Sequence, residues 1–340
     1  MPGVASRIAR RLPAPVRRGL GKVWDAGGIL RRRPRGWTNY LRSSLSEALH
    51  TGRAWGRPVS ITLEPTNVCN LRCPVCETGS GVLGREPAMM PYETFVTLLD
   101  KVGPGANHLM FYFMGEPFLN PDAYRMIRYA RRMGLYVTTC SNGEAADPEG
   151  LYDSGINHTS FQIGGVTQDT HAVYRRGGDL PRELDVLKRY LALVRERGRQ
   201  PGEHQVELGF ILMKHNEHEV EAFHALARDL GVDRAVVISP TVRTPEQADT
   251  FLPTDEAYWL FDRQAFERRR ELVPKTGLPP NVCPWLYFAM TIQVDGTVVP
   301  CCRDACGTHV VGNLLEEPLE EVWNGRAMRA FRRQVYTDRS

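Results

Sequence analysis

The chain has no run of about 18 apolar residues, which is the length that a membrane-spanning helix needs. The N-terminus also lacks the apolar segment of a secretory signal peptide. Together these absences predict a cytoplasmic protein. In the reducing cytosol, clustered cysteines are more often metal ligands than disulfide partners, and the sequence has eight cysteines.

Positive charge is concentrated in one part of the sequence. The formal net charge is only +4, yet residues 1–57 carry thirteen Arg and Lys side chains against two acidic ones, Asp25 and Glu47. Three interpretations are open for this basic arm: a solvated segment, a contact for anionic lipid, or a contact for nucleic acid. Because Leu, Val, Ile and Trp are interleaved with the arginines, peripheral contact with an anionic membrane is favoured over nucleic acid.

From about residue 59 onward, short apolar runs alternate with segments whose apolar residues have helical spacing. Repeated strand–helix units predict an α/β fold, with a parallel sheet and helices outside it. In such folds, functional groups gather where the strands end. The expected strands are 59–65, 109–113, 135–140, 158–163, 205–213 and 234–239, and the main expected helices are 91–102, 121–134, 181–197 and 217–230.

The sequence changes character after this series. Residues 241–280 are polar and contain prolines, and we interpret them as a linker with one helix. A small module is expected over 281–340, where two β-rich runs meet at Asp295-Gly296 as in a hairpin. A helix at about 319–335 closes this module. The main α/β domain then covers 58–240.

Three cysteines follow the first expected strand: Cys69, Cys73 and Cys76, with the spacing C-x3-C-x2-C. A cubane [4Fe–4S] cluster has four irons, which are usually held by thiolates. Three thiolates in one short loop would hold three irons and leave the fourth iron open for a chelating ligand. The alternative is a structural zinc site completed by a distant Cys or His.

This spacing, after the first strand of an α/β series, strongly resembles the radical S-adenosylmethionine (SAM) enzymes. The resemblance implies a partial (βα)6 barrel of the TIM type and a [4Fe–4S] cluster held by the three cysteines and SAM. It also implies a reductant such as flavodoxin or ferredoxin. In that family, reductive cleavage of SAM gives a 5′-deoxyadenosyl radical that abstracts a substrate hydrogen.

The resemblance also implies SAM contacts where the second and third strands end. The family's GGEP-like segment corresponds to Met114-Gly115-Glu116-Pro117, in which Gly115 is kept and Glu116 is suited to the SAM ammonium group. Ser141 and Asn142 match the polar residues that contact the ribose.

Two further contacts follow from the resemblance, and one of them departs from the family pattern. Arg175 or Arg176 is the expected partner of the SAM carboxylate. Val75 stands where relatives usually carry an aromatic residue, so contact with the adenine at this point would be aliphatic. The stretch FQIGG, residues 161–165, also lacks an Asp that is common in the family.

A second cysteine group lies in the C-terminal module and resembles the SPASM/twitch extension of radical SAM enzymes. The resemblance implies at most one auxiliary iron–sulfur cluster, with Cys283, Cys301 and Cys306 as ligands. Cys302 would join them only if the chain bends, since adjacent side chains on an extended strand face opposite ways. A zinc knuckle is the alternative. The isolated Cys140 is expected to be a buried, inert thiol.

These observations predict a radical SAM enzyme. The implied outcomes are dehydrogenation, epimerisation or bond formation, so an oxidoreductase, an isomerase and a transferase all remain open. Peptide, sugar and lipid substrates also remain open. Two alternatives belong to other classes of protein: a non-catalytic iron–sulfur electron carrier, which would not need SAM-binding residues, and a zinc-binding nucleic-acid module.

Overall fold

The computed structural model describes residues 36–275 and 281–337 of the chain. Its centre is a curved sheet in which six consecutive strands pair in parallel with their sequence neighbours. The sequence alternation predicted this series, and the α/β fold is confirmed. The six strands are β1 (Ser60–Leu63), β2 (His108–Met110), β3 (Tyr136–Ser141), β4 (His158–Ile163), β5 (Gln205–Ile211) and β6 (Arg234–Ile238).

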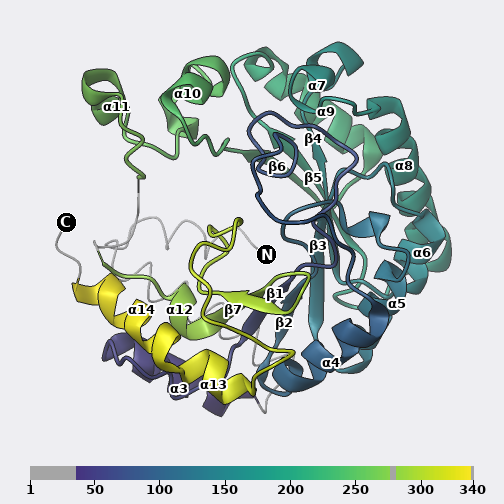
Figure 1. Cartoon of the computed structure of the whole chain (residues 1–340). Helices are drawn as coiled ribbons and strands as arrows, with labels where there is room; N and C mark the ends of the chain where they lie inside the picture. The colour runs from purple at the N-terminus through teal and green to yellow at the C-terminus, as the bar shows by residue number, and fades with distance from the viewer. Residues whose placement is uncertain (1–35, 276–280, 338–340) are drawn as a thin grey trace, which may run out of the picture.

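Helices cover the outer side of this sheet, as in a partial barrel (Figure 1). Their apolar faces pack on the strands, and side chains such as Phe95, Ile127 and Leu187 are fully buried there. Several of these helices end at a glycine with positive φ, which glycine adopts without steric cost; Gly134 and Gly231 are examples. The helices are α4 (Tyr92–Val102), α5 (Ala123–Arg132), α6 (Pro148–Asp153), α7 (Gln168–Tyr174), α8 (Leu180–Arg197) and α9 (Val220–Leu230), with short 3-10 helices η2 (Gly103–Gly105), η3 (Pro117–Leu119) and η4 (Glu217–Glu219) between elements.

The C-terminal module continues the same sheet. Its first strand, β7 (Ala289–Ile292), pairs in parallel with β1, and β8 (Thr297–Val299) and β9 (Gly312–Asn313) follow in antiparallel. The predicted hairpin turn at Asp295-Gly296 is confirmed, and Gly296 has φ 85°. The helices of the module are α12 (Trp285–Phe288), α13 (Leu319–Asn324) and α14 (Arg326–Thr337). The expected closing helix is therefore two helices, which meet at Gly325.

The segment after β6 has more structure than expected. It contains two helices, α10 (Pro245–Phe251) and α11 (Arg263–Arg269), with the 3-10 helix η5 (Glu256–Tyr258) between them, where one helix was predicted. The missed helix begins with a proline, and Thr244 caps it by accepting a hydrogen bond from the backbone N–H of Gln247. Buried Phe251 and Phe266 join an apolar cluster with Val75 and Tyr174. This segment therefore packs against the cysteine loop.

The C-terminal module packs against α3 (Trp37–Ala48), the first helix that the structure describes. Helix α3 lies beside α12, where the rings of Tyr40 and Phe288 are 5.2 Å apart. The last part of the predicted basic arm is therefore an ordered helix, and residues 1–35 lie outside the described residues. No helix among the described residues is long and apolar enough to cross a membrane.

Candidate active site

The three-cysteine loop leaves the C-terminal end of β1 and folds back on itself. Cys73 is buried, and Cys69 and Cys76 are half-buried. Gly79 lies directly against the backbone of Cys73, and a Cβ atom at Gly79 would clash with its N and O atoms. The loop can close here because glycine has no side chain, rather than through any special backbone conformation.

One cavity collects most of the predicted site residues. The three cysteines of the loop after β1 face it, and the residues that follow β2 and β3 line its wall. The carboxyl ends of neighbouring parallel strands meet at one edge of a sheet, which explains why residues so far apart in sequence converge. The predicted residues that line the cavity are Cys69, Cys73, Cys76, Gly115, Glu116, Ser141, Asn142 and Arg175.

Glu116 joins the ends of β2 and β3. Its Oε1 accepts hydrogen bonds from the Ser141 hydroxyl (2.8 Å) and from the Phe118 N–H (3.2 Å), and its Oε2 accepts one from the Asn142 N–H (2.8 Å). A carboxylate has about four acceptor positions, so one remains on Oε2. Burial raises the pKa of Glu116, and the three donated hydrogen bonds act in the opposite direction.

Asn142 ties the end of β3 to the cysteine loop. Its side-chain amide donates to Asn70 Oδ1 at 2.8 Å and lies 4.0 Å from the Cys69 sulfur. Asn70 in turn donates to the Glu144 carboxylate at 3.0 Å. Gly115, with φ 93°, lets the segment after β2 come close to the same loop, because a Cβ there would meet the carbonyl oxygen of Val68. The loop is thus held from two strand ends.

The structure separates the two candidate arginines. Arg175 lines the cavity beside Cys73, whereas Arg176 lines a different hollow together with Arg72 and Ser80. Helix α7 ends at Tyr174, so the backbone turns between the two arginines and sends their side chains apart. Arg175 Nε is buried and has no hydrogen-bond partner among the described residues.

Burial favours the protonated form of two thiols in the loop, those of Cys69 and Cys73, when no metal is bound. It raises the pKa of Cys69 to about 12. It also raises the pKa of Cys73, although Arg175 beside it acts in the opposite direction. A metal binds the thiolate and releases the proton, so these cysteines suit a strongly bound metal cluster better than free solvent-facing chemistry.

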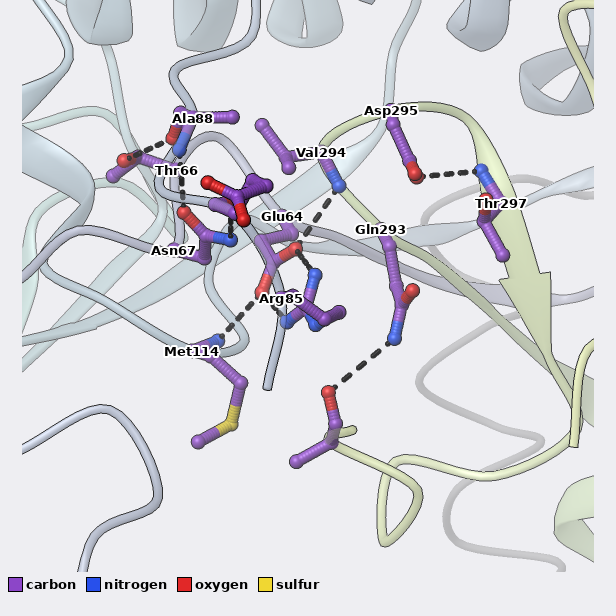
Figure 2. A network of polar contacts seen from close by, with 12 residues as sticks. Glu64, Thr66, Asn67, Arg85, Ala88, Met114, Gln293, Val294, Asp295 and Thr297 are labelled. Carbon is purple, nitrogen blue, oxygen red and sulfur yellow. Dashed lines mark hydrogen bonds and ion pairs between the residues drawn. The ribbon is translucent and has the colours of Figure 1, made fainter. Parts of the chain in front are cut away.

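Behind the cavity wall, Glu64 connects three segments (Figure 2). Arg85 donates two hydrogen bonds of 2.7 Å, one to each carboxylate oxygen of Glu64. The backbone N–H groups of Met114 and Val294 donate to the same carboxylate at 3.3 Å and 3.0 Å. Glu64 is fully buried, and its pKa is raised by burial against the lowering effect of Arg85. Sequence reasoning missed this residue, which links β1 to the segment before Gly115 and to the C-terminal hairpin.

The second cysteine group lies where the chain leaves β8. That strand ends at Val299, so Cys301 and Cys302 occupy a turn rather than an extended strand. The extended strand on which Cys302 was expected to face away from Cys301 therefore ends before these residues, and the neighbouring Cys302 side chain lowers the pKa of Cys301. Cys283 is close enough to Cys301 for their charges to interact. The Cys306 thiol is 3.8 Å from the Val82 carbonyl oxygen, beyond the first cysteine loop.

The cavity also contains residues that the sequence did not single out. Tyr112, Gln162 and Tyr174 line it, and so does Cys140, which was expected to be a buried, inert thiol. Cys140 is half-buried because it alternates with buried neighbours along β3 and faces the barrel interior, a signal that the alternation already carried. Val75 is in the apolar cluster with Tyr174 and does not line the cavity.

In the described part of the chain, no three His, Cys, Asp or Glu side chains are placed to share a single metal ion. Thiolates of one cluster bind separate irons, so a cluster needs a wider arrangement than a single ion does. The three cavity cysteines, a nearby arginine and a buried carboxylate with a remaining acceptor position fit a cluster with a charged ligand beside it.

Comparison with known proteins decides the family. A model of the radical SAM superfamily matches residues 63–227, and a model of the SPASM iron–sulfur cluster-binding domain matches residues 283–340. The chain belongs to the radical SAM superfamily. The radical SAM enzymes that resemble it include an AdoMet-dependent heme synthase of Methanosarcina barkeri, 24% identical over 309 residues, which cover 81% of this chain and 85% of the relative. A PqqA peptide cyclase of Methylorubrum populi is 26% identical over 266 residues, which cover 72% of this chain and 66% of the cyclase.

Solved structures of radical SAM enzymes share the fold. Streptococcus suis SuiB bound to its precursor peptide SuiA matches with a TM-score of 0.63 at 13% identity, over 89% of this chain and 72% of that one. The enzyme anSMEcpe with bound AdoMet and the Kp18Cys peptide matches with a TM-score of 0.56 at 15% identity, over 83% of this chain and 84% of that one. At these identities the likeness supports the partial barrel alone.

The family membership settles the class of chemistry. This chain is a radical SAM enzyme with a SPASM domain, and its cofactors are a [4Fe–4S] cluster with SAM and auxiliary iron–sulfur. The electron-carrier and zinc-module alternatives are set aside by this finding.

Proposed function

We propose that this enzyme cleaves SAM reductively and uses the resulting 5′-deoxyadenosyl radical to take a hydrogen atom from a substrate carbon. One observation carries the proposal: the three cysteines and five predicted SAM contacts line a single cavity, which lies at the carboxyl ends of β1, β2 and β3 and beside the end of α7. A non-catalytic cluster site would not need this set of polar residues next to its thiols.

Cys69, Cys73 and Cys76 are the proposed ligands of the SAM-binding cluster. Their support is the closed loop that Gly79 permits and the cavity that all three share. The chain supplies a fourth thiol nearby, Cys140, but that residue comes from β3 and not from the loop. It serves as an internal comparison in the tests below.

Glu116 and Arg175 are the proposed partners of the two charged groups of the SAM methionine end. The remaining acceptor position on Glu116 Oε2 suits an ammonium group, and the unpaired Nε–H of Arg175 suits a carboxylate. Ser141 already donates its proton to Glu116, so at the ribose it would accept a hydrogen bond. Asn142 would orient the adjoining loop through Asn70.

Cys283, Cys301 and Cys302 are the proposed core of an auxiliary site, with Cys306 as a further ligand. Support comes from the position of Cys301, which feels the charge of Cys283 and the neighbouring thiol of Cys302. In such enzymes an auxiliary cluster takes an electron from a substrate radical or anchors the substrate, so dehydrogenation, epimerisation and bond formation all stay within this proposal. Domain boundaries at 58–240 and 281–340, and a flavodoxin or ferredoxin as the reductant, are part of the same proposal.

The test is SAM cleavage by anaerobically reconstituted full-length protein. With dithionite as reductant, we expect 5′-deoxyadenosine, measured by chromatography and mass spectrometry. Iron-loaded protein that binds SAM and yields no 5′-deoxyadenosine would contradict the proposal. Peptides are the first substrates to add, because two of the similar proteins are named for a peptide cyclase activity and a bound precursor peptide. Deuterium transfer into 5′-deoxyadenosine then identifies the substrate.

A further inference from the structure

Helix α3 turns its apolar side to the solvent. Trp37, Leu41, Leu45 and Leu49 recur every fourth residue from the start of the helix to its C-cap, so they form one stripe. Their exposed fractions rise along the stripe from 38% to 42%, 53% and 62%. The helices of globular proteins normally bury such a stripe. We call these four residues the α3 stripe.

The opposite face of α3 shows how the helix is held in place while the α3 stripe stays exposed to solvent. Ser43 and Ser46 are fully buried, and Ser46 Oγ accepts a hydrogen bond from the Trp55 N–H at 2.8 Å. Asn39 donates to the carbonyl oxygens of Arg57 and Gly105, both at 3.0 Å. The helix is thus attached through small polar residues and specific hydrogen bonds. Tyr40 adds a ring contact with Phe288 at 5.2 Å, and Trp37 stacks on Tyr40 at 6.4 Å. Leu41, Leu45 and Leu49 stay between 42% and 62% exposed, so their apolar character has another cause.

Exposed arginines lie on α3 and on the neighbouring α14, where they outnumber Glu47, the acidic residue of α3. Arg42 is exposed on α3 itself, and Arg329 and Arg333 are exposed on α14, which lies next to α3 in Figure 1. The aliphatic part of Arg333 reaches Gly52. None of these three arginines forms an ion pair among the described residues. The sequence of residues 1–35, which directly precedes α3, adds ten basic residues and one acidic residue.

We propose that the α3 stripe and its arginines form a docking surface for an anionic lipid bilayer. Apolar side chains with Trp at one end, flanked by arginines, are the composition with which an interfacial helix lies in the headgroup region. Each arginine near an anionic surface adds attraction of about 1 kcal/mol. A second copy of this chain would bring like charges together, and so would residues 1–35. The bilayer is the occupant whose charge is complementary.

The docking surface lies at the far end of the barrel from the cavity. Asn39 contacts Gly105 and Arg57, which precede β2 and β1, whereas the cysteine loop follows the carboxyl end of β1. Docking through α3 therefore holds the enzyme at a membrane while the cavity stays open. The sequence indicated lipid contact only for the whole arm, and the structure assigns it to one face of one helix.

Vesicle sedimentation tests this proposal with the full-length, cluster-loaded protein. The vesicles are phosphatidylcholine alone and phosphatidylcholine with phosphatidylglycerol. We expect binding to the anionic vesicles that weakens with salt. The variant with Leu41→Gln, Leu45→Gln and Leu49→Gln keeps helix propensity and should bind at least about tenfold more weakly. Leu260→Gln is the control, because Leu260 is also 38% exposed but lies in the segment between α10 and α11.

Three results would overturn the proposal. The first is anionic-vesicle binding by the triple Gln variant equal to that of the parent, which would assign lipid contact to residues 1–35 alone. The second is no binding of the parent protein to either kind of vesicle. The third is a dimer, measured by light scattering, that the triple variant loses without any change in lipid binding. SAM cleavage should be equal in all variants, which separates failure here from failure of the proposed function.

Discussion

The two cysteine groups of this chain differ in how firmly the protein holds them. The loop with Cys69, Cys73 and Cys76 is closed by a glycine contact and is bonded to two strand ends, through the backbone N–H of Glu116 and the side chain of Asn142. The group with Cys301 and Cys302 occupies a turn, and Cys302 and Cys306 are exposed. A cluster that presents an open iron to SAM needs a cysteine loop and a cavity wall that are already formed before the cluster binds. A cluster with more protein ligands can shape its own turn on binding.

The largest effect that this comparison predicts is that of Cys73→Ala. The variant should lose the SAM-binding cluster and all 5′-deoxyadenosine formation, while its circular dichroism stays that of a folded protein. Cys140→Ala is the matched control: Cys140 lines the same cavity but is not in the loop, so the iron of the SAM-binding cluster should be retained. SAM cleavage by Cys73→Ala would remove the proposed role of this loop.

Removing the partner of Glu64, the residue that links β1 to the C-terminal hairpin, should have the next largest effect. Arg85→Met leaves the fully buried Glu64 carboxylate without its cation. We expect the free energy of unfolding to fall by about 3 kcal/mol, measured with urea. The comparison variant is Arg53→Met, whose ion pair with Glu320 is more than half exposed and should contribute little. Equal losses in the two variants would show that Glu64 does not couple β1 to the hairpin.

Arg175→Met should act on SAM binding rather than on folding. We expect the affinity for SAM to fall about tenfold, because a charged hydrogen bond is worth about 1.5–3 kcal/mol. Arg176→Met, one residue away and facing another hollow, should bind SAM as the parent does. Equilibrium dialysis on anaerobic, cluster-loaded protein measures both. If Arg176→Met lost affinity for SAM and Arg175→Met did not, Arg176 would be the SAM contact and Arg175 would not.

Cys301→Ala should have the smallest effect on SAM cleavage. The auxiliary iron should be lost, so that the iron content falls, while uncoupled formation of 5′-deoxyadenosine continues. Iron analysis and electron paramagnetic resonance separate the two clusters. If this variant lost SAM cleavage as completely as Cys73→Ala, the two cysteine groups would not be independent and the comparison would fail.

Sequence patterns predicted the fold well because each parallel strand has a short local pattern, an apolar run between two helical segments. They also predicted which strand ends would meet, since that follows from the order of the strands. They could not choose between Arg175 and Arg176, because the choice depends on where α7 ends. They could not find Glu64, whose partners Arg85 and Val294 are 21 and 230 residues away.

The α3 stripe shows a different kind of limit. Apolar residues at helical spacing normally predict a buried face, and here the buried face carries Ser43 and Ser46. Hydrogen bonds to distant carbonyl oxygens outweigh the pattern, and only the structure contains them. Likewise, the neighbourhood of Cys301 and Cys302 depends on β8 ending at Val299, a boundary that short strands leave undefined in sequence.

The pairing of β7 with β1 has a consequence for how this protein is made. One edge of β1 finds its partner only when residues 289–292 have left the ribosome, long after β1 to β6 are complete. Until then the nascent barrel has an open strand edge, and the Glu64 carboxylate lacks the N–H of Val294. An open edge of this kind invites pairing with other chains. The C-terminal module thus closes the fold as well as carrying cysteines, and a chain that stops before it is expected to aggregate.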